Sequence, residues 1–440
     1  MNSRLPKVLH QLAGRPMLHH VLQALQALKP NPLVVVYGHG GQALPQAFAE
    51  APVTWALQQE QRGTGHALLQ ALPHLQPEGT VLVLYGDVPL LQSTTLRQML
   101  SLCQGQHLVL LTQQLEEPTG YGRILRTAQG TVCGIREEKD ATAQERAITE
   151  INTGIMALPA RHLAGWLQAL NCANAQQEYY LTDVVSQAVA QGVQVLTVTP
   201  EFTWEAMGVN NRAHLAQLER IYQQRQAHQL LEAGVALADP ARLDVRGTLH
   251  CAQDVHIDVG CVFEGQVTLE EGVQVGAYCV LRDCRVAAHT VLQPYCHLDG
   301  VQIGPANRLG PYARLRPGCV TGSGVHVGNF VEVKNTTLGD HTKANHLTYL
   351  GDATVGCEVN IGAGTITCNY DGVNKHHTTI GDQVFIGSDT QLVAPVTVEQ
   401  GATIGAGSTI VSRAPAHQLT VSRAKQVTIP RWQRPTRKKP

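Results

Sequence analysis

The sequence IDVGCV FEGQVT LEEGVQ VGAYCV (residues 257–280) repeats every six residues. The same spacing returns in IGPANR LGPYAR LRPGCV TGSGVH VGNFVE (303–332) and in IGDQVF IGSDTQ LVAPVT VEQGAT IGAGST (380–409). Each unit nearly always begins with Ile, Val or Leu, and its second residue is very often Gly. A helix repeats its apolar face about every 3.6 residues and a strand every two, so the period fits neither. It predicts a solenoid, in which each unit buries its apolar residue by stacking on the next.

Six residues suit one flat side of a triangular coil, because a short strand can be followed by a small residue at the corner. Three units would then make one coil. The repeat is broken by a few five-residue units and by TCNYDGVNKHHTT (367–379), an insertion that must leave the coil as a loop. A solenoid needs only stability, so this polar loop is a candidate functional element.

Composition limits the possible functions of the chain. Its 440 residues suffice for two or three domains, and its net charge of −1 favours neither nucleic acid nor an anionic membrane. Only the C-terminal tail RWQRPTRKKP (431–440) is basic. No apolar run approaches the ~20 residues that span a bilayer, and no signal peptide opens the chain. The 11 cysteines form no CxxC pair, so we interpret them as reduced thiols of a cytoplasmic protein.

Residues 1–212 alternate between strand-like and helix-like segments, which predicts an α/β, doubly wound, mostly parallel sheet. Ligands bind such sheets at the carboxyl ends of the strands, where the segment YGD (85–87) would lie. Residues 213–233 have helical spacing and no proline, and we expect them to form a linker helix. The solenoid domain then occupies residues 234–440, with the basic tail at its end.

A set of ordered motifs points to a family. The first half contains LPKVLHQLAGRPML, LQQEQRGTGHA, LYGDVPL, PTGYGRI, EINTGI, NAQQEYYLTD and GVNNR. The second half contains RLRPG, HVGNFVEVK, NHLTYLGD, VNIGAGTITCNYDG and IGSDTQLVAPV. In this order they resemble the bacterial bifunctional N-acetylglucosamine-1-phosphate uridyltransferases and glucosamine-1-phosphate N-acetyltransferases, over essentially the whole chain. The resemblance implies a left-handed parallel β-helix of hexapeptide repeats and a homotrimer formed through it.

For the uridyltransferase domain the resemblance implies UTP, N-acetylglucosamine-1-phosphate and Mg²⁺. Uridylyl transfer crowds phosphate oxygens, so it needs cations more than a covalent nucleophile. Asp87 at a strand end suits Mg²⁺ as a hard oxygen ligand, and the resemblance pairs it with Asn210. The other positions that the resemblance assigns to nucleotide or sugar are Lys7, Gln58, Gly63, Thr64, Tyr85, Gly86, Gly122, Glu137 and Asn152. Taken singly, each glycine could be a tight turn and Asp87 a strand-end cap, so the hypothesis rests on the set.

For the second domain the resemblance implies glucosamine-1-phosphate and acetyl-CoA. The amine arrives largely protonated, so acetyl transfer needs a base, and histidine, with an unperturbed pKa of ~6.5, suits that role. His346 replaces the usual aliphatic-Gly start of a unit, and the resemblance makes it the catalytic base. The resemblance further assigns Arg316, Lys334, Tyr349 and Asn360 to the sugar phosphate. It assigns Ala363, Asn369, Tyr370, Ser388, Ala406 and Arg423 to acetyl-CoA, although Ala363 and Ala406 could equally be small corner residues.

One departure concerns the start of the chain. The family opens with a strand and a glycine-rich loop of the type LAAGKGTRM, whereas Met1 here falls where the last Met of that signature would fall. We expect the natural chain to be longer. For the chain as given we predict weak or absent uridyltransferase activity, because the amides that cradle phosphate would be missing.

Four hypotheses follow from the sequence: the bifunctional enzyme, an acetyltransferase alone, a trimeric scaffold that binds sugar nucleotides without turnover, and another sugar-1-phosphate nucleotidyltransferase with a β-helix tail. The polar set around His346 and the inserted loop count against the scaffold, which needs neither. The segments NHLTYLGD and TITCNYDG disfavour the other nucleotidyltransferases.

Overall fold

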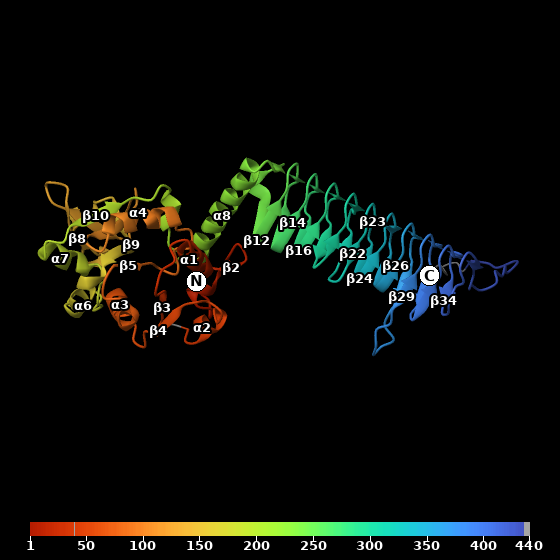
Figure 1. Cartoon of the computed structure of the whole chain (residues 1–440), viewed down its shortest axis with the longest axis horizontal. Helices are drawn as coiled ribbons and strands as arrows, with labels where there is room; N and C mark the ends of the chain where they lie inside the picture. The colour runs from red at the N-terminus through yellow and green to blue at the C-terminus, as the bar shows by residue number, and fades with distance from the viewer. Residues whose placement is uncertain (39, 435–440) are drawn as a thin grey trace, which may run out of the picture. The chain divides into compact units, whose positions relative to one another are not determined.

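A computed structural model describes residues 1–38 and 40–434 (Figure 1). His39, next to the predicted strand that ends at Gly38, and the last six residues of the basic tail lie outside the described residues. The chain forms two compact units, Met1–Tyr222 and Gln223 onward. Within the part of the chain that is described, no helix is long and apolar enough to cross a membrane.

The first unit contains a six-stranded sheet. Its strands are β5 (Thr80–Val83), β6 (Leu108–Gln114), β7 (Gly122–Arg126), β8 (Val132–Arg136), β9 (Glu150–Pro159) and β10 (Val195–Val198). β10 runs parallel to β6, but β9 is antiparallel to β5, β6 and β7. The sheet is therefore mixed rather than mostly parallel. The reason is local: β7 and β8 form a hairpin, and β9 follows them without the long crossover that a parallel neighbour requires.

A second, separate sheet of the first unit contains only β3 (Val34–Tyr37) and β4 (Thr54–Leu57), which are parallel. The predicted doubly wound sheet is thus divided into two parts. Between β3 and β5 lies a cavity of about 900 Å³, lined mainly by aliphatic side chains of these strands and of the neighbouring helices α1 and α3.

Helices cover both sheets of the first unit. They are α1 (Met17–Gln26), α2 (Ala43–Ala47), α3 (Thr64–Ala71), α4 (Ser93–Cys103), α5 (Ala143–Arg146), α6 (Ala160–Gln168) and α7 (Asp183–Ala190). A short hairpin of β1 (Gln11–Leu12) and β2 (Arg15–Pro16) precedes α1. In α4, Leu96, Met99 and Cys103 recur at helical spacing and are fully buried, so this face packs into the core with β6 and β9.

Helix α8 (Arg212–Glu232) contributes to each unit separately. In the first unit, the carboxylate of Glu219 accepts a hydrogen bond of 2.7 Å from the backbone N–H of Ala13. In the second unit, the buried amide of Gln223 donates to Val245 O at 2.9 Å and accepts from Val245 N at 2.8 Å. The amide of Gln223 therefore pairs with the first coil as another strand would, while Ala227 packs into the core of the coils.

The second unit is a parallel β-helix. One of its faces, which we call face A, consists of β11 (Ala236–Leu237), β13 (His256–Ile257), β15 (Gln274–Val275), β17 (Val291–Leu292), β20 (Arg308–Leu309), β23 (His326–Asn329), β25 (Lys343–His346), β27 (Asn360–Ile361), β30 (Phe385–Ile386), β33 (Thr403–Ile404) and β35 (Leu419–Thr420). The next face along each coil, face B, begins in β12 (Leu243–Cys251), β14 (Cys261–Leu269), β16 (Val280–Val286), β18 (His297–Asp299), β21 (Arg314–Leu315), β24 (Glu332–Leu338), β26 (Tyr349–Val355), β28 (Ile366–Cys368), β31 (Gln391–Val393) and β34 (Thr409–Ile410). The third side contains β19 (Gln302–Ile303), β22 (Val320–Thr321), β29 (Thr378–Ile380), β32 (Val396–Val398) and the later residues of the longest face B strands.

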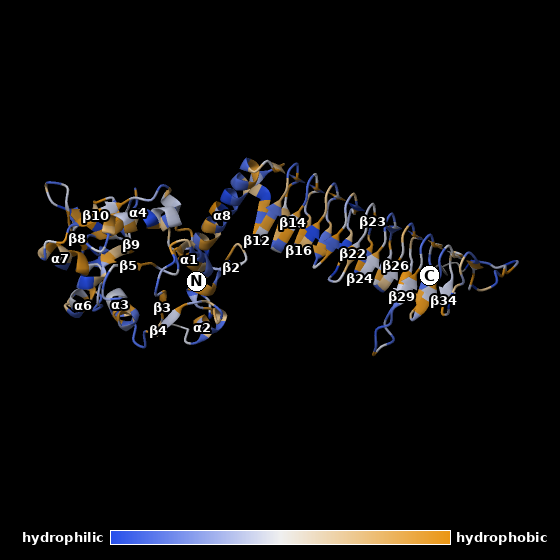
Figure 2. Ribbon diagram, viewed as in Figure 1, coloured by the Kyte–Doolittle hydropathy of each residue, from blue (hydrophilic) through white to orange (hydrophobic). Residues whose placement is uncertain are grey.

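The register of the coils follows the sequence repeat. Leu243 pairs with Cys261, which is 18 residues later, and Val280 pairs with His297, 17 residues later, where a five-residue unit replaces a hexad. The first residue of each unit points inward, so aliphatic side chains stack into a continuous buried core. Burying one such side chain contributes about 1.5–3 kcal/mol, which explains why the repeat alone predicted a solenoid. Figure 2 shows apolar and polar residues alternating along β12, β14 and β16.

Candidate active sites

In the first unit, three of the predicted residues meet at one point. The ammonium of Lys7 forms an ion pair with the carboxylate of Asp87 and donates a hydrogen bond of 3.2 Å to Asn210 Oδ1. The backbone places them there, because Val209 N donates to Asp87 O at 2.9 Å and so brings Asn210 beside the end of β5. Two oxygen ligands of the type that Mg²⁺ prefers therefore converge on a single cation, and they fit the metal that the sequence implied.

The predicted nucleotide-reading residues line the loop before α3. Gln58 donates to Gly63 O at 3.2 Å, and Thr64 Oγ1 accepts a hydrogen bond of 3.1 Å from Leu181 N. Gly63 has a φ of +107°, and a side chain there would collide with the backbone of Tyr179, so this position requires glycine. His66, which the sequence reasoning missed, contacts the Gln58 amide at 3.1 Å.

Tyr85 connects the nucleotide-reading loop to the predicted sugar residues. Burial, with the nearby carboxylates of Glu137 and Asp87, raises the pKa of Tyr85 to about 12, while a hydrogen bond with Thr64 opposes the shift. Gly154 leaves room for this ring, since a Cβ there would lie 2.4 Å from it. The phenol therefore stays protonated at neutral pH and can donate a hydrogen bond.

The three predicted sugar-binding residues lie together on neighbouring strands. Gly122 pairs with Asn152 across β7 and β9, and a Cβ on Gly122 would lie 3.5 Å from the Glu137 carboxylate. Burial raises the pKa of Glu137, and a hydrogen bond of 2.8 Å from Thr182 Oγ1 opposes that rise. Thr182 belongs to the motif NAQQEYYLTD but was not singled out from the sequence.

A buried arginine supports the loop that leads to Gly122. The guanidinium of Arg123, only 2% exposed, pairs with Glu138 at 2.7 Å and also donates to the carbonyl of Tyr121. Glu138 in turn accepts from Gly120 N at 3.2 Å, and these bonds lower its pKa. The sequence reasoning did not single out Arg123, because a charged residue beside a turn carries no sign of burial.

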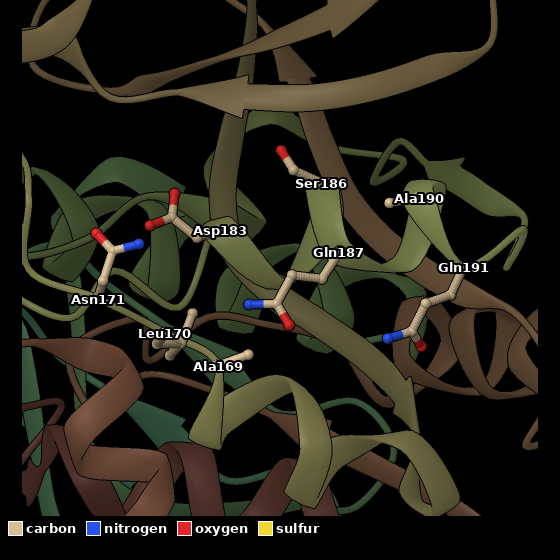
Figure 3. Close-up of a pocket in the computed structure, with 8 residues that line it drawn as sticks. All are labelled: Ala169, Leu170, Asn171, Asp183, Ser186, Gln187, Ala190 and Gln191. Carbon is tan, nitrogen blue, oxygen red and sulfur yellow. The ribbon is translucent and has the colours of Figure 1, made fainter.

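The cavity between β3 and β5 opens onto this group, since Lys7, Gln58, Thr64, Tyr85 and Gly86 line its wall. A second cavity, of about 560 Å³, lies between α6 and α7 and is lined by polar side chains such as Asn171, Asp183 and Gln187 (Figure 3). It contains none of the predicted site residues.

In the second unit, His346 ends β25 at the corner where face A turns into face B, which we call corner AB. Its Nδ1 lies 3.0 Å from Asn329 Oδ1, one coil earlier. The following coils place small residues at the same corner: Asp389 N donates to Ala363 O at 2.7 Å, and Gly407 N donates to Ser388 O at 2.8 Å. The predicted acetyl-CoA residues Ala363, Ser388, Ala406 and Arg423 thus follow His346 in one column, in which Arg423 donates to Ala406 O at 3.0 Å.

The predicted cations lie on face B beside that corner. Arg316 pairs with Glu332 at 2.9 Å, and Lys334 pairs with Asp352 at 3.4 Å. Tyr349 is the register partner of Glu332 on the next coil. Asn360 is different, because it lies on face A in β27, around the corner from Arg316 and Lys334.

The inserted loop leaves face B after β28 and returns at β29. Asn369 is buried at its start, where it donates to Asp352 and to Tyr349 OH, whereas Tyr370 is 60% exposed. Lys375, which we did not predict, lies beside Lys334, and the neighbouring ammonium lowers the pKa of Lys375. Asp352 orders this group by also accepting from Asn335 at 2.7 Å, a role that its place in NHLTYLGD alone did not reveal.

Comparison with known proteins gives three family matches. The MobA-like NTP transferase domain matches residues 1–239, the GMPPB C-terminal domain matches residues 245–349, and six bacterial transferase hexapeptide repeats match residues 377–412. The solved structure of a UDP-glucose pyrophosphorylase complexed with UDP-glucose is 14% identical and covers 50% of this chain and 91% of its own, with a TM-score of 0.42. That score is too low to support any statement about this chain.

Full-length relatives are much more similar. The bifunctional protein GlmU of Aromatoleum aromaticum is 57% identical over 100% of this chain and 96% of its own length. Those of Cupriavidus pinatubonensis and Cupriavidus taiwanensis are 56% and 59% identical, covering 100% and 99% of this chain and 96% of each relative.

Proposed function

Because this chain belongs to the family of bifunctional GlmU proteins, we propose that each of its units performs one group transfer at the residues described above. The chain is a glucosamine-1-phosphate N-acetyltransferase and an N-acetylglucosamine-1-phosphate uridyltransferase. The second unit acetylates glucosamine-1-phosphate with acetyl-CoA. The first unit then transfers a uridylyl group from UTP to the product, N-acetylglucosamine-1-phosphate, and releases pyrophosphate.

In the proposed acetyl transfer, His346 takes a proton from the amine of the sugar. The amine nitrogen attacks the thioester carbonyl, the C–N bond forms, and the C–S bond to coenzyme A breaks. Arg316 and Lys334 hold the sugar phosphate, since charge-assisted hydrogen bonds to phosphate oxygens are strong. Lys375 adds a third cation from the inserted loop.

Acetyl-CoA binding is proposed along corner AB after His346. Ala363, Ser388 and Ala406 present little side-chain volume there, so an extended pantetheine arm can approach the backbone of three successive coils. Arg423 at the end of this column can pair with a phosphate of coenzyme A. Asn369 and Tyr370 sit at the start of the inserted loop, which places them beside the same corner.

In the proposed uridylyl transfer, the sugar phosphate oxygen attacks the α-phosphorus of UTP and pyrophosphate leaves. Lys7 supplies positive charge to the crowded phosphate oxygens, and Asp87 and Asn210 would hold Mg²⁺, which when bound neutralises the charge that develops on them. Gln58, Gly63 and Thr64 face the uracil, while Gly122, Glu137 and Asn152 hold the sugar. Gly86 keeps the backbone beside Asp87 unobstructed, because a Cβ there would lie 3.1 Å from Val8.

The observation that carries the acetyl-transfer assignment is the exposed His346, oriented by Asn329 at the head of a column of small corner residues. We expect His346→Ala to lower the rate of acetyl transfer at least ~100-fold, because it removes the base. Thermal unfolding should stay unchanged, since the side chain is exposed.

The matched control is His341→Ala, an exposed histidine at a different corner, which should keep the wild-type rate. Full acetyl transfer by the His346 variant would show that another group is the base.

We also infer that the protein is a homotrimer assembled through the β-helix. The match to hexapeptide transferase repeats supports this inference. Light scattering on the purified chain should give three times its mass of 47.6 kDa.

A further inference from the structure

Corner AB carries a row of large apolar side chains before it reaches His346. Tyr278, Tyr295, Tyr312 and Phe330 occupy equivalent positions on four successive coils, with ring centroids 5.5, 4.8 and 5.3 Å apart and nearly parallel planes. Leu347 follows on the next coil. We call these five residues the aromatic ladder. Each ladder side chain is 46–64% exposed.

The backbone at the ladder makes this choice of residues unusual. All five residues have φ between +47° and +64°, a region that bulky L residues rarely adopt and that glycine enters without strain. The corner between the third side and face A has the same backbone, but it carries polar or small residues such as Asp254, His289, Ala306 and His341. Large apolar groups are therefore placed at one corner where the fold does not require them.

The same corner changes character at the proposed catalytic residue. Before His346 the column is filled with rings, and after it the positive-φ positions are Gly364, Asp389 and Gly407. The residues that we assign to acetyl-CoA lie in this second part. One continuous edge therefore has a bulky apolar half and an open half, and His346 marks the boundary.

A single chain does not assemble the whole proposed site, and this step rests on the proposed function. Arg316 and Lys334 extend from face B, whereas Asn360, assigned to the same substrate, lies on face A. Outward side chains on two faces that meet at a convex corner point away from each other. Small-molecule sites enclose most of their ligand, which an exposed corner cannot do.

We propose that the aromatic ladder is the surface on which a second copy of this chain docks, with face A of one copy opposite face B of the other. The groove between the copies is then filled by the rings before His346 and open to acetyl-CoA after it. Asn360 of one copy and Arg316 of the other lie on the two walls of that groove.

Two features favour a second copy over an unrelated partner. The ladder repeats once per coil, at the ~4.8 Å spacing of neighbouring strands, and an identical β-helix laid alongside has the same repeat along its whole length. The four half-exposed rings offer roughly 400 Å², about half of the ~800 Å² that each partner buries in a stable interface. The outward residues of faces A and B supply the remainder.

The test uses the full chain with the triple variant Tyr278→Gly, Tyr295→Gly and Tyr312→Gly, none of which lies among the proposed site residues. Glycine is favoured at positive φ, so the variant should fold, which circular dichroism and thermal unfolding will check. The matched control is Asp254→Gly, His289→Gly and His341→Gly, three exposed positive-φ positions on the other corner.

We expect wild type and control to be assembled in analytical ultracentrifugation and the ladder variant to be monomeric at the same concentration. Acetyl transfer by the ladder variant should fall at least ~100-fold and recover in part at higher protein concentration. A ladder variant that keeps the wild-type mass would overturn the proposal. A monomeric wild type would also overturn it and leave the ladder for a different partner.

Two further outcomes separate this proposal from the proposed function. A monomeric variant with full acetyl transfer would retain the docking surface but refute the shared site. An assembled wild type that loses its assembly in the ladder variant, yet never transfers acetyl groups, would refute the proposed function alone.

Discussion

At the scale of single residues, Asn329 orients the proposed base. Its Oδ1 lies 3.0 Å from His346 Nδ1, which favours the tautomer with the proton on Nδ1 and leaves Nε2 to accept the proton of the amine. We expect Asn329→Ala to lower kcat for acetyl transfer by about 10- to 100-fold with little change in KM. Asn329→Asp should recover most of kcat, because a carboxylate oxygen accepts the same hydrogen bond. Equal loss in both variants would contradict a role in orientation.

Glu137 is a residue whose burial opposes stability. Its pKa is raised in the folded state, so the native protein binds this proton more tightly than the unfolded chain does. Stability from this group is therefore lost as pH rises from the unfolded value of about 4.5 through the raised folded value.

Glu137→Gln should remove this loss, keep the hydrogen bond from Thr182, and raise the Tm of the first unit at pH 7 by roughly 2 °C. Calorimetry at pH 4 and pH 7 measures the effect, which should be small at the lower pH. Exposed Glu116→Gln is the control and should change the Tm at neither pH. A Tm gain that is equal at both values would contradict the ionisation argument.

At the scale of elements, α8 closes the open end of the β-helix through Gln223. Its side-chain amide makes two hydrogen bonds with the backbone of Val245, as a neighbouring strand would. Gln223→Ala leaves a buried N–H and C=O without these bonds, and we expect it to destabilise the second unit by ~2 kcal/mol. Urea unfolding of the exposed Gln224→Ala control should match wild type. A Gln223 variant as stable as that control would show that the pairing adds nothing.

The inserted loop shows how an element can depart from a repeat without damaging it. β28 and β29 keep their parallel partners on the coils before and after, although Ile366 pairs with Gln391, 25 residues later. The extra residues carry Asn369, Tyr370 and Lys375 to the neighbourhood of Lys334 and Asp352. The coil thus remains a frame, and the loop adds the side chains that it cannot supply.

At the scale of the whole molecule, the two units have separate hydrophobic cores. Three of the four tryptophans, Trp55, Trp166 and Trp204, belong to the first unit, and Trp432 is 65% exposed near the C-terminus. Tryptophan fluorescence will therefore report mainly the first unit, while far-ultraviolet circular dichroism reports both. We expect the two signals to give different urea midpoints, because each core can unfold by itself. Coincident midpoints would show that the units unfold as one.

Much of this could be predicted because it depends on local pattern. The six-residue period determines which side chains point inward, and a coil of three units follows from it whatever precedes the chain. The motifs also determined the family, and residues such as Lys7, Asp87 and Asn210 do meet although 203 positions separate the first from the last. The break at 367–379 was visible because it interrupts a strict repeat.

Tertiary structure decided what the pattern does not encode. A polar residue in a sequence does not reveal its partners, so Arg123, Asp352 and Lys375 became visible only when distant segments were packed together. The antiparallel course of β9 depends on strand pairing, which is a long-range choice. The four rings of the aromatic ladder are scattered 17 or 18 residues apart in the sequence, and only the coil stacks them at one corner, because its rise brings each turn about one strand spacing above the last.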